Sequence, residues 1–252
     1  HKIINQPVES IENNIFIASN ILALAERFEK RIFMFSTSEV YGKSLKFPFE
    51  EDDDIILGPY KKMRWSYAVS KLIDDFLSRA YFEQNQTAVT MVRLFNTIGT
   101  GQVGHYGMVV PRFFDQAMTN KTITVYGTGQ QSRSFTDVRD VVDALLSLVN
   151  CFQAYGELIN IGSSEETKIF ELAKMIKYLC QSHSKIEIYP YEHGYGKNFE
   201  DMERRQPCCE KLARLTGYRT QYLLENTLAW IYQNKIKQIT PSIKPFVDTS
   251  IF

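Results

Sequence analysis

The sequence YAVSK places Tyr67 and Lys71 four residues apart, in a stretch whose apolar periodicity predicts a helix. Residues at this spacing share one helix face, so the ammonium of Lys71 can act on the phenol of Tyr67. A phenol with an ordinary pKa of about 10 is a poor base at neutral pH, and a nearby cation favours its ionised form. The pair predicts a tyrosine base activated by a lysine. The alternative is an exposed Tyr-Lys pair without function. With 14 tyrosines in the chain, about one Tyr-Lys pair at this spacing is expected by chance.

A second polar group follows an apolar run. RIFMFST predicts a strand buried on both faces of a parallel sheet, and Thr37, Ser38 and Glu39 stand at its end. Ligands bind at the carboxyl ends of strands in open α/β sheets, where hydroxyls and a carboxylate can steer proton movement. The alternative is that Thr37 and Ser38 only satisfy amides of a turn.

The elements that must position these residues alternate along the chain. Helices are predicted at 8–29 and 66–84 and strands at 31–37 and 88–96, with a loop at 43–63. The later elements are shorter: helices at 108–118, 137–150 (with Asp137 as N-cap), 167–181, 207–217 and 223–236, and strands at 123–127, 132–138, 156–162 and 185–190. This order predicts an α/β fold, with a Rossmann-like parallel sheet and a small C-terminal α/β substrate lobe. We expect residues 1–162 to belong to the sheet domain, with an excursion into the lobe near 99–133, and 163–252 to form mainly the lobe.

Composition excludes several classes of protein. Lys and Arg total 29, as do Asp and Glu, so no cationic field for nucleic acid is predicted. The four cysteines form no C-x-x-C pair and the four histidines lack ligand spacing, so we expect no metal site and a reducing, cytoplasmic setting. No apolar run approaches the ~20 residues of a membrane span and no signal peptide is present, so no membrane association is expected.

A glycine-rich run, GTGQVGHYG at 99–107, resembles a phosphate-binding loop in composition. It does not match G-x-x-x-x-G-K-[ST]. We therefore predict a flexible loop over a cleft.

Five motifs occur together: STSEVYG, YAVSK, VRLFNTIG, ITVYGTGQQSRSFTDVRDVVDAL and NIG. In order and spacing they resemble the extended short-chain dehydrogenase/reductase family of nucleotide-sugar enzymes, the NAD-dependent epimerases and dehydratases. The Thr-Ser-Glu triplet most resembles that of the UDP-glucuronate decarboxylases, also called UDP-xylose synthases.

The resemblance implies NAD as cofactor, a UDP-sugar as substrate, and a role for each matching residue. Thr37 resembles the group that hydrogen-bonds the reacting sugar hydroxyl, Tyr67 the base, and Lys71 its activator, which also binds the nicotinamide ribose. The other implied site residues are Glu39 in catalysis, Leu94 at the cofactor, and Ser38, Asn96, Tyr126, Arg133 and Arg205 at the substrate. Asn96 would contact the sugar diphosphate. Without the family resemblance, Arg133 and Arg205 would be predicted to be solvated surface arginines. For Tyr126, a place in the core is expected as much as a place near the nucleotide base.

The first residues resemble the fourth helix of the family. The usual glycine-rich turn that begins the domain, and the acidic residue that holds the adenosine ribose, are therefore expected to be absent. Strand 31–37 would then lack a neighbour on one side. The family also implies a homodimer formed by the helices at 8–29 and 66–84, with Phe76, Leu77 and Tyr81 supplying part of a second apolar face.

Three rival functions remain. A 4,6-dehydratase is disfavoured, because Ser38 stands where dehydratases carry an acidic Asp, and a hydroxyl is too weak an acid for that step. A UDP-sugar 4-epimerase remains open, although epimerases usually lack an acid at Glu39. A non-catalytic nucleotide-sugar binding subunit is opposed by the presence of Thr37, Tyr67 and Lys71.

Overall fold

The computed structural model describes residues 6–104, 108–195 and 199–239. Its central sheet has three parallel strands, β1 (Ile32–Thr37), β2 (Val89–Leu94) and β7 (Leu158–Ile161), in the order β1-β2-β7. The parallel register aligns Thr37 with Leu94 and Leu94 with Ile161, so the carboxyl ends of all three strands meet at one edge. Among the described residues β1 and β7 are the two edge strands, so β1 lacks a neighbour on one side, as expected from the sequence.

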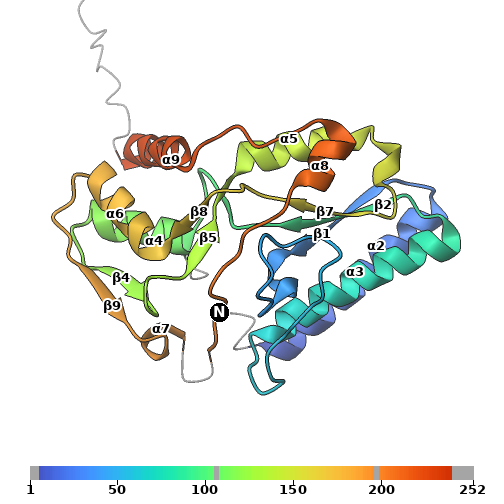
Figure 1. Ribbon diagram of the computed structural model, residues 1–252, viewed down its shortest axis with the longest axis horizontal. Coiled ribbons are helices and arrows are strands. Elements are labelled where there is room, and N and C mark those ends of the chain that lie inside the picture. Colours follow the sequence, from blue (N-terminus) through green and yellow to red (C-terminus); the bar gives the residue numbers. More distant parts are fainter. Residues whose placement is uncertain (1–5, 105–107, 196–198, 240–252) are drawn as a thin grey trace, which may run out of the picture.

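Helices cover both faces of this sheet (Figure 1). α2 (Pro7–Arg27) and α3 (Trp65–Asn85) lie side by side on one face, where Ala18 and Leu22 pack against Met34, Val89 and Met91. α5 (Val138–Val149) and α8 (Glu210–Thr216) lie on the other, where their apolar residues join the cluster of Val92, Ile159 and Ile161. Coverage of the parallel sheet on both faces explains why apolar residues dominate these strands instead of alternating with polar ones.

The rest of the chain forms a second group of elements at the other end of the molecule (Figure 1). Its helices are α4 (Val109–Met118), α6 (Ile169–Leu179), α7 (Glu192–Tyr195) and α9 (Leu224–Ile239). Its strands pair as β4 (Ile123–Tyr126) with β9 (Ile186–Tyr189), and β5 (Ser132–Ser134) with β8 (Glu166–Lys168). Their core centres on Phe113, Phe114, Ile123 and Leu172, all fully buried. The fold class is therefore the predicted one, whereas the exact domain boundaries stay a prediction.

The short elements differ most from expectation. The strand expected at 132–138 is two, β5 and β6 (Thr136–Asp137), and β6 pairs with the unpredicted β3 (Thr97–Ile98). The helix expected from residue 167 begins at Ile169, because Glu166–Lys168 pair with β5. The 3-10 helices η1 (Ser38–Tyr41) and η3 (Phe152–Ala154) and helix α7 were also not predicted. Asp137 is confirmed as the cap of α5, since its carboxylate accepts from Arg139 N at 2.8 Å.

A buried ion pair joins helix α3 to the central strand. Arg93 of β2 donates from Nε and Nη2 to Asp75 Oδ2 of α3, at 3.1 and 3.0 Å. Arg93 also lies 4.6 Å from the ring centroid of Tyr41, whose hydroxyl donates to Asn160 Oδ1 at 2.8 Å. These contacts set the position of α3, which carries Tyr67, relative to the sheet. Within the described residues, no helix is long and apolar enough to span a bilayer.

We expect Asp75→Asn to lower the free energy of unfolding by about 3–5 kcal/mol, because it leaves the Arg93 guanidinium buried without its carboxylate. Urea unfolding followed by circular dichroism would measure this. Glu83→Gln on the same helix breaks the exposed Arg79–Glu83 pair and should cost less than about 1 kcal/mol. Equal losses in the two variants would contradict the positioning role of the pair.

Candidate active site

The three polar residues at the end of β1 form the first side of the site. Thr37 is the N-cap of η1, and its Oγ1 accepts from Glu39 N at 3.3 Å, so it does satisfy a turn amide. Its hydroxyl proton stays available for donation to a ligand. η1 ends at Gly42, where φ is +61° and a Cβ would lie 2.2 Å from the carbonyl oxygen of Ile56, so only glycine fits the turn.

Tyr67 and Lys71 occupy the first turns of α3, as predicted, but their expected coupling is not observed. Lys71 Nζ donates to Asp74 Oδ2 at 2.6 Å. Burial raises the pKa of Tyr67, and the negative charges of Glu39 and Asp74 raise it further. In this structure Asp74 takes up the Lys71 ammonium, so Lys71 does not offset this rise. The role of Lys71 as the activator of Tyr67 stays a prediction.

Glu39 connects this side of the site to two arginines. Its Oε2 lies 3.3 Å from Arg64 Nη2, and its Oε1 lies 3.6 Å from Arg205 Nη1. Arg64, the N-cap residue of α3, was missed in the sequence. Its position one helical turn before Tyr67 is a signal that could have found it.

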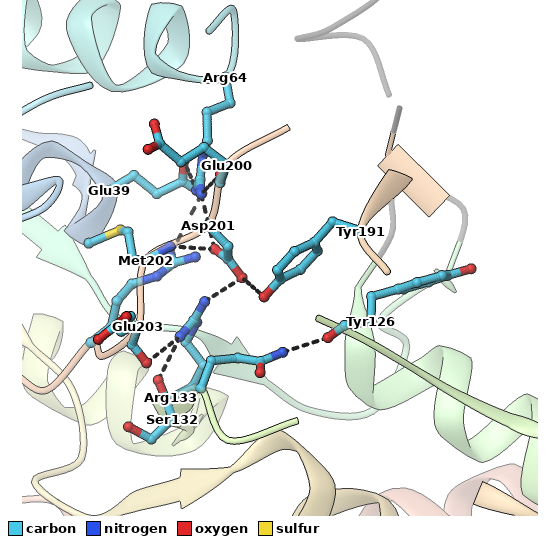
Figure 2. A network of polar contacts seen from close by, with 12 residues as sticks. Glu39, Arg64, Tyr126, Ser132, Arg133, Tyr191, Glu200, Asp201, Met202 and Glu203 are labelled. Carbon is cyan, nitrogen blue, oxygen red and sulfur yellow. Dashed lines mark hydrogen bonds and ion pairs between the residues drawn. The ribbon is translucent and has the colours of Figure 1, made fainter. Parts of the chain in front are cut away.

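A second carboxylate, Asp201, lies among the same arginines (Figure 2). Its Oδ1 is 3.0 Å from Arg64 Nη1, and its Oδ2 is 2.7 Å from Arg133 Nη2. Tyr191 Oη donates to Oδ2 at 3.2 Å, and Met202 N donates to Oδ1 at 2.9 Å. Although burial opposes ionisation, the three nearby arginines hold the pKa of Asp201 at about 2. Asp201 was also missed in the sequence.

Arg133 and Arg205 are not the surface arginines that sequence reasoning without the family would predict. Arg133 of β5 is only 5% exposed, and its Nη1 donates to the carbonyl oxygens of Ser132 and Glu203, at 2.7 and 3.4 Å. Burial, together with the charge of Arg133, lowers the pKa of Arg205 to about 10, and its buried Nε has no hydrogen-bond partner among the described residues.

The linked side chains of this arginine–carboxylate cluster are Arg64, Arg133, Arg205, Glu39 and Asp201. Three cations thus face two anions, which leaves one excess positive charge. Because the side chains are largely buried, water screens this charge poorly. An anionic group on a ligand would neutralise it.

The remaining predicted site residues lie around this cluster. Leu94 ends β2 beside Thr37, in the register of the sheet. Asn96 Nδ2 donates to the carbonyl oxygen of Ser134 at 3.1 Å, which ties the end of the sheet to β5. Tyr126, at the end of β4, stacks with the Arg112 guanidinium at 4.7 Å and meets Tyr195 edge-on. Ser38 is buried.

The glycine-rich run is a separate feature. Gly99, Gly101 and Gly104 have the G-x-G-x-x-G spacing of a dinucleotide fingerprint, although such a glycine-rich turn was expected to be absent. However, the run follows the two-residue strand β3, which lies outside the central sheet. Gly99–Gly104 line a hollow of about 710 Å³ together with α4 and α9, away from Tyr67. Residues 99–104 thus lie beside a hollow as expected, and they do not form the first turn of a dinucleotide-binding fold. The flexibility of the loop stays a prediction, and residues 105–107 lie outside the described residues.

Comparisons with known proteins agree with this geometry. The NAD dependent epimerase/dehydratase family matches residues 2–162. The chain is 39% identical over 228 residues to the UDP-N-acetyl-alpha-D-glucosaminuronate decarboxylase of Bacillus cytotoxicus, covering 88% of this chain and 70% of the relative. It is 34% identical over 222 residues to UDP-glucuronic acid decarboxylase 1 of Danio rerio, covering 88% of this chain but only 51% of the relative.

Among solved structures, the epimerase Mth375 of Methanothermobacter thermautotrophicus superposes with a TM-score of 0.84 at 26% identity, over 93% of this chain and 68% of the other. The chain therefore belongs to the NAD dependent epimerase/dehydratase family, and the expectations of family, fold, enzyme class and NAD dependence are confirmed at that level. The roles of the individual site residues stay predictions.

The electrostatics of Tyr67 can be tested directly. Glu39→Gln removes a negative charge that disfavours the phenolate, so we expect the pKa of Tyr67 to fall and ionisation to begin at lower pH. Ultraviolet difference titration of each protein against its Tyr67→Phe counterpart isolates this one phenol. The matched control is Glu50→Gln, which alters an exposed carboxylate paired with Lys46 and should leave the titration unchanged. A pKa that stays the same or rises in Glu39→Gln would contradict the assigned coupling.

Proposed function

We propose that this chain carries the catalytic residues of an NAD-dependent UDP-hexuronate decarboxylase. The observation that carries the proposal is the excess positive charge of the arginine–carboxylate cluster beside Tyr67, which suits a sugar bearing a carboxylate. The names of the two relatives give further support, because both are decarboxylases of UDP-linked uronates. Carbon 2 of the sugar would carry either a hydroxyl group, as in UDP-glucuronate, or an acetamido group, as in UDP-N-acetylglucosaminuronate.

Tyr67 would remove the proton of the sugar 4-hydroxyl, with the Thr37 hydroxyl hydrogen-bonded to the same oxygen. When bound, NAD supplies a hydride acceptor and donor at C4. Lys71, one helical turn from Tyr67, would leave Asp74 to stabilise the phenolate and contact the cofactor ribose, near Leu94. Oxidation at C4 turns a hexuronate into a β-keto acid, whose C5–carboxylate bond breaks with release of carbon dioxide and electron flow to the C4 carbonyl.

The cluster would hold the charged parts of the substrate. Arg133 and Asn96 would contact the diphosphate, Arg205 the carboxylate, and Tyr126 the region of the base. Glu39 would take part in the transfer of the proton that C5 gains after decarboxylation. Its contacts with Arg64 and Arg205 hold its carboxylate at the site. Ser38, which is buried next to Thr37 in the chain, would contribute to the substrate-binding end of the strand.

The 4-epimerase is the second candidate, because the epimerase Mth375 shares this fold at 26% identity. An epimerase needs the same oxidation at C4 but no carboxylate on the sugar. With an uncharged sugar, only the diphosphate would neutralise the cluster, and Arg205 would lack the carboxylate assigned to it. A silent binding subunit is less well supported, since Thr37 and Tyr67 occupy the expected strand end and helix.

Product analysis separates these functions. We expect the full-length protein to release labelled carbon dioxide from UDP-glucuronate or UDP-N-acetylglucosaminuronate carrying a ¹³C carboxylate, and to leave UDP-glucose unchanged. Tyr67→Phe should lower turnover by about 10²–10⁴-fold with UDP-sugar binding retained, because it removes the base and little packing. Interconversion of UDP-glucose and UDP-galactose, with both uronates ignored, would replace the decarboxylase by the epimerase.

We also propose that the protein is a homodimer joined through α2 and α3. Large apolar side chains project from both helices, with Phe16 63%, Ile17 62% and Phe76 68% exposed. Leu77 and Tyr81, expected on the same outer face, instead pack against the core beside Met34. The outer face therefore depends more on α2 than the sequence suggested.

Phe76→Glu should convert a dimer into a monomer at micromolar concentration, because a charge would be buried without a partner. Sedimentation velocity measures this. Tyr178→Glu, at an 87% exposed site on α6, is the matched control and should leave the dimer intact. A wild-type protein that sediments as a monomer at every concentration would exclude the proposed dimer.

A reducing, cytoplasmic location is part of the same proposal. All four cysteines are free in the structure. Free thiols persist where glutathione and thioredoxin keep them reduced.

A further inference from the structure

A single carboxylate joins the two parts of the arginine–carboxylate cluster. Asp201 accepts two hydrogen bonds at each oxygen, from Arg64 Nη1 and Met202 N at Oδ1 and from Arg133 Nη2 and Tyr191 Oη at Oδ2 (Figure 2). Arg64 comes from the start of α3 and Arg133 from β5. Asp201 therefore holds guanidinium groups that approach it from the sheet side and from the lobe side.

The other contacts of these arginines show how much Asp201 restrains them. Arg64 also contacts Glu39 and the carbonyl oxygen of Glu200, and its guanidinium lies 5.2 Å from the ring centroid of Phe199. Arg133 Nη1 donates to the carbonyl oxygen of Ser132 at 2.7 Å, while its Nη2 donates to Asp201 Oδ2 at 2.7 Å. Without the Asp201 carboxylate, three guanidinium groups would face Glu39 alone, and their repulsion would favour displacing one of them.

We propose that Asp201 is a positioning residue of the candidate active site, which orients Arg133 and Arg64 before an anionic nucleotide-sugar binds. The substrate class rests on the proposed function. Two charge-assisted hydrogen bonds fix the arginines in advance, so a ligand need not supply the free energy of ordering them. Asp201 also offsets one positive charge, which leaves the cluster with a single excess charge for the ligand.

UDP alone is the probe for the test, because it carries the diphosphate but no sugar. In full-length Asp201→Asn we expect the Kd for UDP, measured by calorimetry, to rise about 10- to 100-fold, the range that hydrogen bonds to a charged group supply. KM for the uronate should rise similarly, with kcat within about threefold, because the reacting atoms are untouched. Asp201→Glu keeps the charge and should recover part of the affinity.

A cycle with Arg133 separates positioning from a general structural role. If Asp201 acts through Arg133 and Arg64, then Asp201→Asn should weaken UDP binding clearly less when added to Arg133→Ala than it does alone, because only its effect through Arg64 remains. Full additivity of the two losses overturns the proposal. Asp115→Asn, which breaks the exposed Lys235–Asp115 pair of the same lobe, should leave UDP binding at the wild-type level. Thermal melting of every variant verifies that it is folded.

Charge alone makes the opposite prediction, since Asp201→Asn raises the net positive charge of the cluster and would tighten UDP binding. Unchanged or tighter binding in that variant therefore overturns the positioning role. Failure of the proposed function appears elsewhere, as a wild-type protein that binds UDP but releases no carbon dioxide from either uronate.

Discussion

The geometry of the site depends on the contacts of the buried Arg93 guanidinium with Asp75 and Tyr41. Arg93 sits on the central strand β2, is only 3% exposed, and bonds Asp75 of α3 while facing the ring of Tyr41 in η1. A buried ion pair adds little net stability, because desolvation offsets the attraction of the charges. What the pair supplies is position: α3, with Tyr67, and η1, with Glu39, are both fixed against the same strand. The base and the carboxylate can then be close although they come from different elements.

The charge of the molecule is balanced overall but not at the site. Equal numbers of acidic and basic residues leave no net charge on the chain, and a bulk count therefore revealed nothing about substrate. The information lies in a local excess of one cation, in a group of side chains that are mostly buried. At low effective dielectric, such an excess counts for much more than it would at the surface. Local charge, rather than net charge, therefore relates this fold to an anionic substrate.

Sequence reasoning succeeded where the relevant contact is local. The helices and the three main strands follow apolar periodicity, and Thr37, Tyr67 and Lys71 were found from the end of a strand and one helical turn. It missed Arg64, although this residue lies one helical turn before Tyr67. It also missed Asp201, whose carboxylate meets the Arg64 guanidinium across 137 residues of chain, a contact that no local pattern marks. The pairing of Lys71 with Asp74 was not expected either, although it is local, because a carboxylate three residues along the helix competes with the phenol for the ammonium. β8 was missed because three residues form a strand only through their pairing with β5.

Backbone hydrogen bonds explain how the last charged residues reach the site. The segment after Asp201 runs beside β5, with Ser132 N donating to the carbonyl oxygen of Glu203 and Ser134 N to that of Arg205. On its other side, Phe49 N donates to the carbonyl oxygen of Gln206. These main-chain hydrogen bonds hold the segment between the lobe and the loop that follows η1. They place Arg205 near Glu39 independently of the attraction between the two charges.

Glu39 consequently belongs to two systems at once. It pairs with Arg64 and Arg205 in the arginine–carboxylate cluster, and its charge raises the pKa of Tyr67. An anion that draws Arg205 or Arg64 away from Glu39 would leave more of that negative charge acting on the phenol, whereas a proton on Glu39 would relieve it. The anion-binding and proton-transfer parts of the site are therefore coupled through one carboxylate, and neither can be altered without a response in the other.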